Sequence, residues 1–332
     1  MSEALRKRLP LSHLPLHDKI FFLTFSAPVI IVSSVLFLLF MVLLLESIPV
    51  LRIQGISTYI STTWRPSIEP PPSVGFFEIY FTAPPGASAW YGLLPAIAGT
   101  FITSLVAIMV SLPLSISLVV FMEEILPKGL KEPVALVVDL MAGMPTILFG
   151  VWGLSVLGPF LARHVAPLLH DYLGFLPLFS CAPLTGYNAL TAGILLGIMI
   201  LPFMTAIIQE SYRSIPYTYR EAAWSIGLTR FEYVSLNMSM ISPAIVSAVL
   251  LGLGRAMSET AAVALVVGNV HNLTTCVLSP MFTVTSLIAN KFAEAALYPY
   301  LSNALFAGGF LLLAFGLVIN TAGLLYMRKV RF

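Results

Sequence analysis

Arg255 and Glu259 are two ionisable residues inside Ile241 to Gly268, a stretch otherwise apolar enough to cross a membrane. An ionised side chain at the centre of a bilayer costs about 3 kcal/mol on insertion scales. Their spacing places both side chains on one face of a helix, where a guanidinium and a carboxylate can meet each other or share a ligand. We therefore predict a functional site at this pair. The alternative is a structural salt bridge that locks this helix to a neighbour.

The composition predicts the kind of element that must hold this pair. Of 332 residues, 58% are hydrophobic and 10% are charged, and the mean hydropathy is +0.94. An ordinary soluble domain carries about 25% charged residues, so the chain is predicted to be a polytopic membrane protein. All spans should be helices, because an open sheet cannot satisfy its backbone in lipid. We expect six of them, at Lys19 to Leu45, Leu93 to Met122, Pro133 to Leu161, Ala189 to Gln209, Ile241 to Gly268 and Leu301 to Met327.

The distribution of positive charge predicts the orientation of these spans. With the N-terminus in the cytoplasm, twelve of the 17 Lys and Arg residues fall inside, four fall outside, and Arg255 lies in the membrane. Since cytoplasmic loops retain Lys and Arg, we expect a multi-pass protein of the cell membrane with both termini cytoplasmic, including a tail at 1–18 and an end at 328–332. The net charge of +2 reflects this asymmetry, and no nucleic acid partner is expected.

Two features of the predicted outer side are distinctive. Residues 46–92 are rich in proline and aromatic residues, which suits either an interfacial loop or a platform for an external partner. Cys181 and Cys276 both fall in predicted outer loops. There they either form a disulfide or remain two unpaired thiols. No Cys and His cluster has the spacing of metal ligands, so no metal site is predicted.

The third apolar run carries Pro145 and several glycines. A helix broken there could line a path through the membrane. Alternatively, the run is a kinked helix whose glycines allow close packing.

The loop at 210–240 is polar enough to lie outside the membrane, yet it is rich in helix formers. Pro216 suits the start of a short helix and Gly227 suits its end. On the cytoplasmic side such a helix could anchor the chain to the membrane surface or fit a groove on a partner protein.

Three motifs resemble a known family. EAAWSIG, from Glu221 to Gly227, resembles the EAA loop of ABC-importer permeases. GLGRAMSETAAVALVVGN, from Gly252 to Asn269, resembles the signature of phosphate-importer permeases of the PstC/PstA type. GMPTILFGVWGLSVLGP, from Gly143 to Pro159, resembles their third span and leans toward PstC.

The resemblance implies a type I ABC-importer permease fold with six spans, five of them in a core domain at 93–327 after a first span at 19–45. It makes Glu221, Ala222, Ala223 and Gly227 part of a cytoplasmic coupling helix. The implied partners are two copies of an ABC ATPase, a second permease subunit in a heterodimer, an extracytoplasmic phosphate-binding protein and membrane lipid. One departure follows the coupling helix, where Asn237 to Met240 replace the usual I-x-L-P and a proline comes only at Pro243.

The resemblance also implies roles for the intramembrane pair. Arg255 would offer bidentate donors to a phosphate in the substrate path. Glu259 would orient Arg255, or accept the proton that hydrogen phosphate carries and sulfate lacks. The sequence has no G-x-x-x-x-G-K-[ST] phosphate loop, so ATP and Mg are expected on the partner ATPase. We expect no cofactor bound by this chain, no catalytic residue and no enzyme activity of its own.

Three other functions agree less well with the sequence. A permease for sulfate or molybdate is disfavoured by the GRAMSET segment. An ion-driven secondary transporter should show paired inverted halves, which the sequence does not display. An intramembrane hydrolase needs a nucleophile and a base, and no histidine lies in any predicted span.

Overall fold

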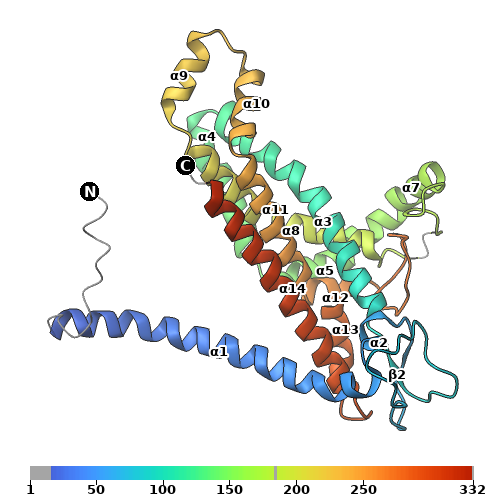
Figure 1. The fold of residues 1–332 in the computed structure, drawn as a ribbon. Helices are drawn as coiled ribbons and strands as arrows, with labels where there is room; N and C mark the ends of the chain where they lie inside the picture. The colour runs from blue at the N-terminus through green and yellow to red at the C-terminus, as the bar shows by residue number, and fades with distance from the viewer. Residues whose placement is uncertain (1–15, 183–184, 331–332) are drawn as a thin grey trace.

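The structure, a computed structural model, describes residues 16–182 and 185–330, so most of the predicted N-terminal tail and the last two residues lie outside it. Figure 1 shows an elongated bundle of helices, from one end of which helix α1 runs outward. The first half of the chain forms α1 (Leu16–Gln54), α2 (Ser57–Ile60), β1 (Trp64–Arg65), β2 (Trp90–Tyr91), α3 (Leu94–Val120), a π-helical turn η3 (Phe121–Ile125) and α4 (Lys128–Gly143).

The second half forms a run of short helical pieces followed by longer helices. The short pieces are α5 (Thr146–Trp152), η4 (Gly153–Leu157), α6 (Gly158–Phe160), η5 (Leu161–Val165) and α7 (Ala166–Leu173). The rest are α8 (Ala189–Arg213), α9 (Tyr217–Ser225), α10 (Arg230–Met240), α11 (Ser242–Met257), α12 (Ala261–Val266), α13 (Val284–Lys291), η6 (Phe292–Glu294) and α14 (Leu301–Val330). The two short strands pair antiparallel, with Trp64 opposite Tyr91.

The helices long and apolar enough to cross a membrane agree with the predicted fold class. Five such segments are found in the described residues, and α10 with α11 makes a sixth if this pair, bent by 62°, is counted as one span. The predicted all-α membrane fold is confirmed. The five segments are Thr24–Gln54, Leu94–Ile125, Thr146–Leu173, Ala189–Arg213 and Leu301–Tyr326.

The third span differs from the prediction. We expected one helix from Pro133 to Leu161, but α4 ends at Gly143, Met144 is extended, and the membrane-length helix runs from Thr146 to Leu173. Pro145 causes the break, since a proline disfavours the helical conformation of the residue before it. The glycines of this run serve close packing: a Cβ on Gly150 would lie 2.9 Å from the Cα of Ala262 on α12.

The centre of the bundle is the contact between α3 and α8. A Cβ on Gly193 of α8 would lie 2.5 Å from Val106 of α3, so only glycine permits this approach of the two backbones. Small residues at such contacts are the usual means of packing helices in membranes. Leu195, Leu196 and Met204 of α8 are at most 1% exposed, and they form the core around which the other spans pack.

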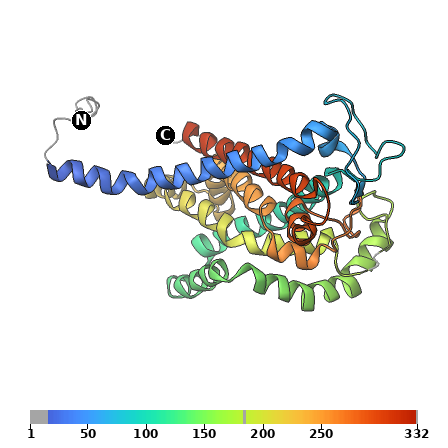
Figure 2. The same cartoon turned by 90° about the horizontal axis from the view of Figure 1, so that it is seen from below.

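Helix α1 packs on the bundle only toward its C-terminal end. Phe40 lies beside Phe310 of α14, with ring centroids 5.2 Å apart. The preceding apolar side chains, such as Val35 and Phe37, are more than half exposed within this chain. Figure 2 shows α1 alongside α14 at one end of the bundle and extending beyond it at the other.

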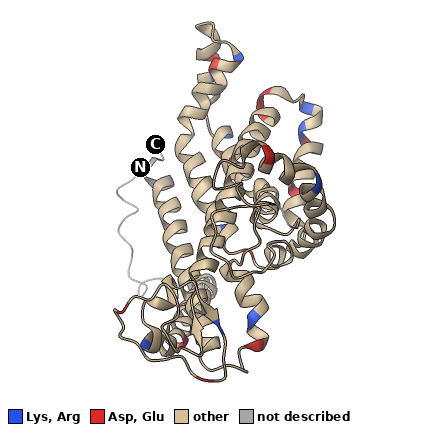
Figure 3. Ribbon diagram, turned by 90° about the vertical axis from the view of Figure 1, so that its right-hand side faces the viewer, with Lys and Arg blue, Asp and Glu red and all other residues tan. Residues whose placement is uncertain are grey.

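The two ends of the bundle carry different structures. Helices α9 and α10 form a tip at one end, whereas α2, β2 and the loops that follow α1 lie at the other (Figure 1). Figure 3 shows charged residues on that tip and on the outer loops, with mostly uncharged helices between them. This arrangement places the predicted coupling segment and the predicted outer loop at opposite ends of the spans.

Candidate functional site: an intramembrane arginine and a helical tip

The predicted pair does not lie on one continuous helix. Helix α11 ends at Met257, the chain turns at Ser258, and α12 begins at Ala261. Side chains replace the missing helical hydrogen bonds: the Ser258 hydroxyl donates to the carbonyl of Arg255 at 3.0 Å, and Thr285 donates to the carbonyl of Glu259 at 2.7 Å. The expectation that Arg255 and Glu259 share a helix face is therefore wrong, because the hydroxyls of Ser258 and Thr285 stabilise a break between them.

Arg255 has its own surroundings on α11. Its guanidinium carbon lies 5.3 Å from the ring centroid of Phe203 on α8, within the range of a cation–π contact. It occupies the last turn of its helix, where the helix dipole favours a cation. Thirteen residues separate it from Ser242, which places it about 20 Å along the helix from the start of α11. The side chain is exposed in this chain.

Glu259 is held separately. Its carboxylate accepts a hydrogen bond of 3.4 Å from the backbone N–H of Ala262, at the start of α12. The N-terminal end of a helix favours a negative charge, so Glu259 has a local electrostatic partner that is not Arg255. Its side chain is half-buried.

Neither residue has an ion-pair partner in the described residues, so the structural salt bridge weighed for this pair is absent there. Arg255 is thus an exposed cation about 20 Å along an apolar span, with an aromatic ring on one side. Ser258 and Thr260 are exposed in the same break. An exposed guanidinium can bind an oxyanion, because its N–H groups donate two parallel hydrogen bonds to it.

The predicted coupling helix is present as α9, with Pro216 at its start. It ends in a Schellman motif: Leu228 N–H donates to the Ala223 carbonyl at 3.0 Å, and Gly227 N–H donates to the Trp224 carbonyl at 3.1 Å. Gly227 has a φ of +77°, which an L-residue adopts only with strain. The predicted start and end of this helix are confirmed.

The surface of α9 is unusual for a solvated helix. Ala223 is buried, whereas Glu221 and Ala222 are exposed, and the Glu221 carboxylate has no ion-pair partner among the described residues. Large apolar side chains around the tip are also exposed: Trp224 by 54%, Ile226 by 75% and Phe231 by 82%. An exposed apolar cluster of this kind marks a contact surface.

Sequence reasoning missed a polar cluster at the base of this tip. Glu123 and Glu124, in the π-helical turn after α3, bind Arg213 and Arg220 respectively, at 2.7 and 3.5 Å. Two adjacent acids that end an apolar run were the available signal. Their partners, at the end of α8 and in α9, come 90 and 96 residues later in the chain, so the pairing depended on the fold.

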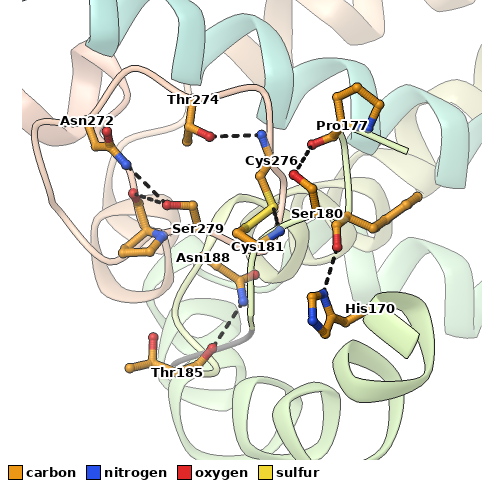
Figure 4. The surroundings of a disulfide bond; sticks show 12 residues. His170, Pro177, Ser180, Cys181, Thr185, Asn188, Asn272, Thr274, Cys276 and Ser279 are labelled. Atoms are coloured by element: carbon orange, nitrogen blue, oxygen red, sulfur yellow. Dashed lines mark hydrogen bonds between the residues drawn. A yellow bond between two sulfur atoms is a disulfide. The ribbon is translucent and has the colours of Figure 1, made fainter. Parts of the chain in front are cut away.

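At the other end of the spans, Cys181 and Cys276 form a disulfide, which the sequence left open. Figure 4 shows that it joins the loop before α8 to the loop between α12 and α13. His170 holds the first loop as well, through a 3.0 Å hydrogen bond between its Nδ1 and the carbonyl of Phe179.

The sequence was compared with known proteins. No family model matches the chain. The probable phosphate transport system permease protein PstC of Methanocaldococcus jannaschii is 40% identical over 301 residues, 90% of each chain. The phosphate transport system permease protein PstC of Mesorhizobium japonicum is 35% identical over 321 residues, 94% of this chain and 91% of that protein. The phosphate transport system permease protein PstC of Xylella fastidiosa is 35% identical over 286 residues, which are 85% of this chain and 82% of that protein.

Among solved structures, an inward-facing MetNI methionine ABC transporter contains a chain that is 18% identical. The match has a TM-score of 0.49 and covers 73% of this chain and 95% of that one.

The membrane-length helices and these relatives define a permease of the ABC-importer class. Within that class, the chain belongs to the PstC family of phosphate transport system permease proteins. The expected leaning toward PstC is confirmed.

Proposed function

We propose that this chain is a permease subunit of an ATP-driven importer of inorganic phosphate. The observation that carries the proposal is Arg255, an exposed cation about 20 Å along α11 without an ion-pair partner in the described residues. An unpaired intramembrane charge marks a site for an ion or substrate. The names of the PstC relatives supply the anion.

In this proposal Arg255 binds two oxygens of the phosphate, and Phe203 holds the guanidinium in place from the opposite face. The hydroxyls of Ser258 and Thr260 donate to the carbonyls of Arg255 and Ser258, and so hold the break that follows Arg255. Glu259 accepts a hydrogen bond from the protonated oxygen of hydrogen phosphate. Sulfate cannot donate this bond because it carries no proton.

Energy comes from a partner. Helix α9 presents Glu221, Ala222 and an apolar cluster to the outside of the chain, which fits docking on an ATPase. Two ATPase copies bind ATP and Mg, a second permease subunit completes the path, and a phosphate-binding protein delivers the anion. This chain itself holds no cofactor in the proposal.

The orientation follows from charge and from the disulfide. Cys181 precedes the N-terminal end of α8 whereas α9 follows its C-terminal end, so the disulfide and α9 lie at opposite ends of this span. Disulfides persist in oxidising compartments, so this end faces outward and α9 faces the cytoplasm, together with both termini. The excess of Lys and Arg on the α9 side agrees with this assignment.

The substrate role is tested by replacing Arg255 in the assembled transporter, reconstituted in vesicles with its ATPase. Arg255→Gln should reduce phosphate uptake at least about a hundredfold while the complex still assembles. Arg255→Lys should retain part of the uptake, because it keeps the charge and loses the bidentate geometry. Uptake unchanged in Arg255→Gln would remove Arg255 from the path. Competition by sulfate or molybdate as strong as by phosphate would assign the permease to another oxyanion.

The coupling role is tested by pull-down of the ATPase. Glu221→Lys and Gly227→Asp should release it, the first by reversing a charge at the docking surface and the second by straining the helix end. Glu132→Lys is the matched control, since Glu132 is an exposed acid on α4. Equal recovery of ATPase with all three variants would contradict docking at α9.

A further inference from the structure

Glu124 and Arg220 connect the tip to the membrane spans. We propose that this ion pair, with Tyr212 and Asn237, is the joint through which a displacement of α9 is transmitted to α3 and α8. We call these four residues the transmission joint. The inference rests on the proposed coupling role of α9 and assigns positioning residues that act behind the docking surface.

The joint brings four helical elements to one carboxylate. Glu124, in the turn η3 that continues α3, accepts a 2.9 Å hydrogen bond from the Tyr212 hydroxyl of α8 and lies 3.5 Å from Arg220 of α9. The Tyr212 hydroxyl in turn accepts a 3.1 Å hydrogen bond from the Asn237 amide of α10. Any movement of α9 therefore pulls on the ends of two core spans through charged and polar bonds.

Arg220 is well placed to transmit a displacement of α9 to Glu124. Its guanidinium lies 5.8 Å from the ring centroids of both Trp224 and Tyr233, so aromatic rings on α9 and α10 support it. It directly precedes Glu221, the first residue of the docking motif. The same short helix thus presents Glu221 outward and directs Arg220 inward.

Glu123 fixes the inner side of the joint. It accepts hydrogen bonds of 2.7 Å from both Gln209 and Arg213 of α8, and Lys131 of α4 lies 3.6 Å away. These bonds tie the end of α3 to the end of α8, so a force applied at Glu124 acts on the two helices together. Helices α3 and α8 also make the close contact at Gly193.

The burial of Glu124 explains why its ion pair with Arg220 should stay formed while α9 moves. The side chain of Glu124 is 8% exposed, and a buried charge separated from its partner is strongly destabilising. Beside it is a cavity of about 480 Å³, lined by three residues of the joint, Glu124, Tyr212 and Arg220, and by Ile215, Pro216 and Tyr217. Packed cores resist deformation, whereas polar bonds beside an open space can pivot without creating new voids.

The test needs a readout of motion that does not depend on the transported anion. Ser258 is exposed in the break of α11, and the two native cysteines are joined in a disulfide, so Ser258→Cys introduces a free thiol there. Its reaction with a water-soluble maleimide, with and without ATP, is measured in the full complex in vesicles without phosphate. We expect ATP to change the labelling rate at least about fivefold.

The variants are Glu124→Gln, Arg220→Gln and the double variant, with Glu132→Gln as the matched control. Each single variant should lose the ATP response of the thiol while the ATPase still co-purifies. The double variant should respond no worse than either single variant, since the two residues act as one unit. In chains that keep Ser258, phosphate transported per ATP hydrolysed should fall at least about tenfold in the single variants.

An unchanged ATP response in both single variants would overturn the joint. So would loss of the ATPase from the complex, because that outcome indicates a structural support of the docking surface. If the thiol responds in the parent complex and not in the variants, but no phosphate enters the vesicles, the joint stands and the phosphate assignment fails.

Discussion

The guanidinium of Arg255 lies over the ring of Phe203, 5.3 Å from its centroid, on the neighbouring helix α8. This contact replaces the expected ion pair with Glu259. An aromatic ring attracts a cation without neutralising it, so Arg255 keeps its full charge for a ligand. The relationship makes Phe203 part of the candidate site even though it has no polar atom of its own.

Replacing Phe203 should therefore weaken phosphate binding without abolishing transport. A cation–π contact of about 1 kcal/mol corresponds to a change of about fivefold, so Phe203→Leu should raise the half-saturating phosphate concentration by about that factor. Initial uptake rates over a range of phosphate concentrations measure it. Phe292→Leu, at an exposed phenylalanine near the outer end, serves as the control. An unaltered half-saturation value in Phe203→Leu would show that the ring does not position Arg255.

The disulfide should stabilise the outer end of the bundle. It closes a separation of 95 residues, and removing such a bond typically costs about 2–4 kcal/mol. A variant with both Cys181→Ser and Cys276→Ser should unfold at a lower temperature in detergent. Reducing agent should lower the midpoint of the natural protein to the same value and leave the variant unchanged. A reductant effect of equal size on both proteins would argue against the bond.

The close contact between α3 and α8 predicts intolerance at Gly193. In Gly193→Val the new side chain collides with Val106, and overpacking of this kind costs about 1–3 kcal/mol. The thermal midpoint of the purified chain should fall accordingly. Gly316→Val on α14 is the matched control, because no atom lies within 4 Å of the corresponding Cβ position. Equal midpoints for the two variants would refute the tight α3–α8 packing.

His271, in the loop between α12 and α13, predicts a pH dependence at the outer end. It lies between the rings of Trp64 and Phe282, with centroids 5.6 and 6.5 Å away. Burial lowers the pKa of His271 to about 4, and the backbone of Thr62 and Gly92 offsets this only in part.

Since the pKa is lower in the folded chain than the usual value of about 6.5, the unfolded chain binds the extra proton first. The contribution of His271 to stability is complete above about pH 6.5 and is lost as the pH falls toward about 4, by about 3 kcal/mol in total. Thermal midpoints measured across this range should fall less steeply for His271→Phe than for the natural chain. Parallel curves would mean that His271 titrates normally.

The membrane spans and the coupling helix were predictable because each depends on local sequence. Long apolar runs define the spans. Pro216 marks the start of α9 and Gly227 its end, each through its own backbone preference. The boundary of the third span was mistaken, since apolar residues continue on both sides of Pro145 and hydropathy alone does not show a turn.

What could not be predicted depends on distant partners. The break after Met257 is stabilised by Thr285, which lies on another helix and is unrelated in sequence pattern. The bonds of Glu124 to Tyr212 and Arg220 likewise require α3 and α8 to end at the same level. Spacing along one helix predicted that Arg255 and Glu259 would meet, and that rule fails wherever tertiary hydrogen bonds interrupt the helix.

The 62° bend between α10 and α11 has a mechanical consequence. Arg255 lies about 20 Å along α11 from this bend. A rigid rotation of α11 by only about 5° would therefore move Arg255 by about 1.7 Å. That distance separates a formed hydrogen bond from a broken one. A lever arm of this length needs no large rearrangement to release an anion. A rotation of α11 by a few degrees at the membrane surface suffices to break the hydrogen bonds between Arg255 and the anion in the middle of the membrane.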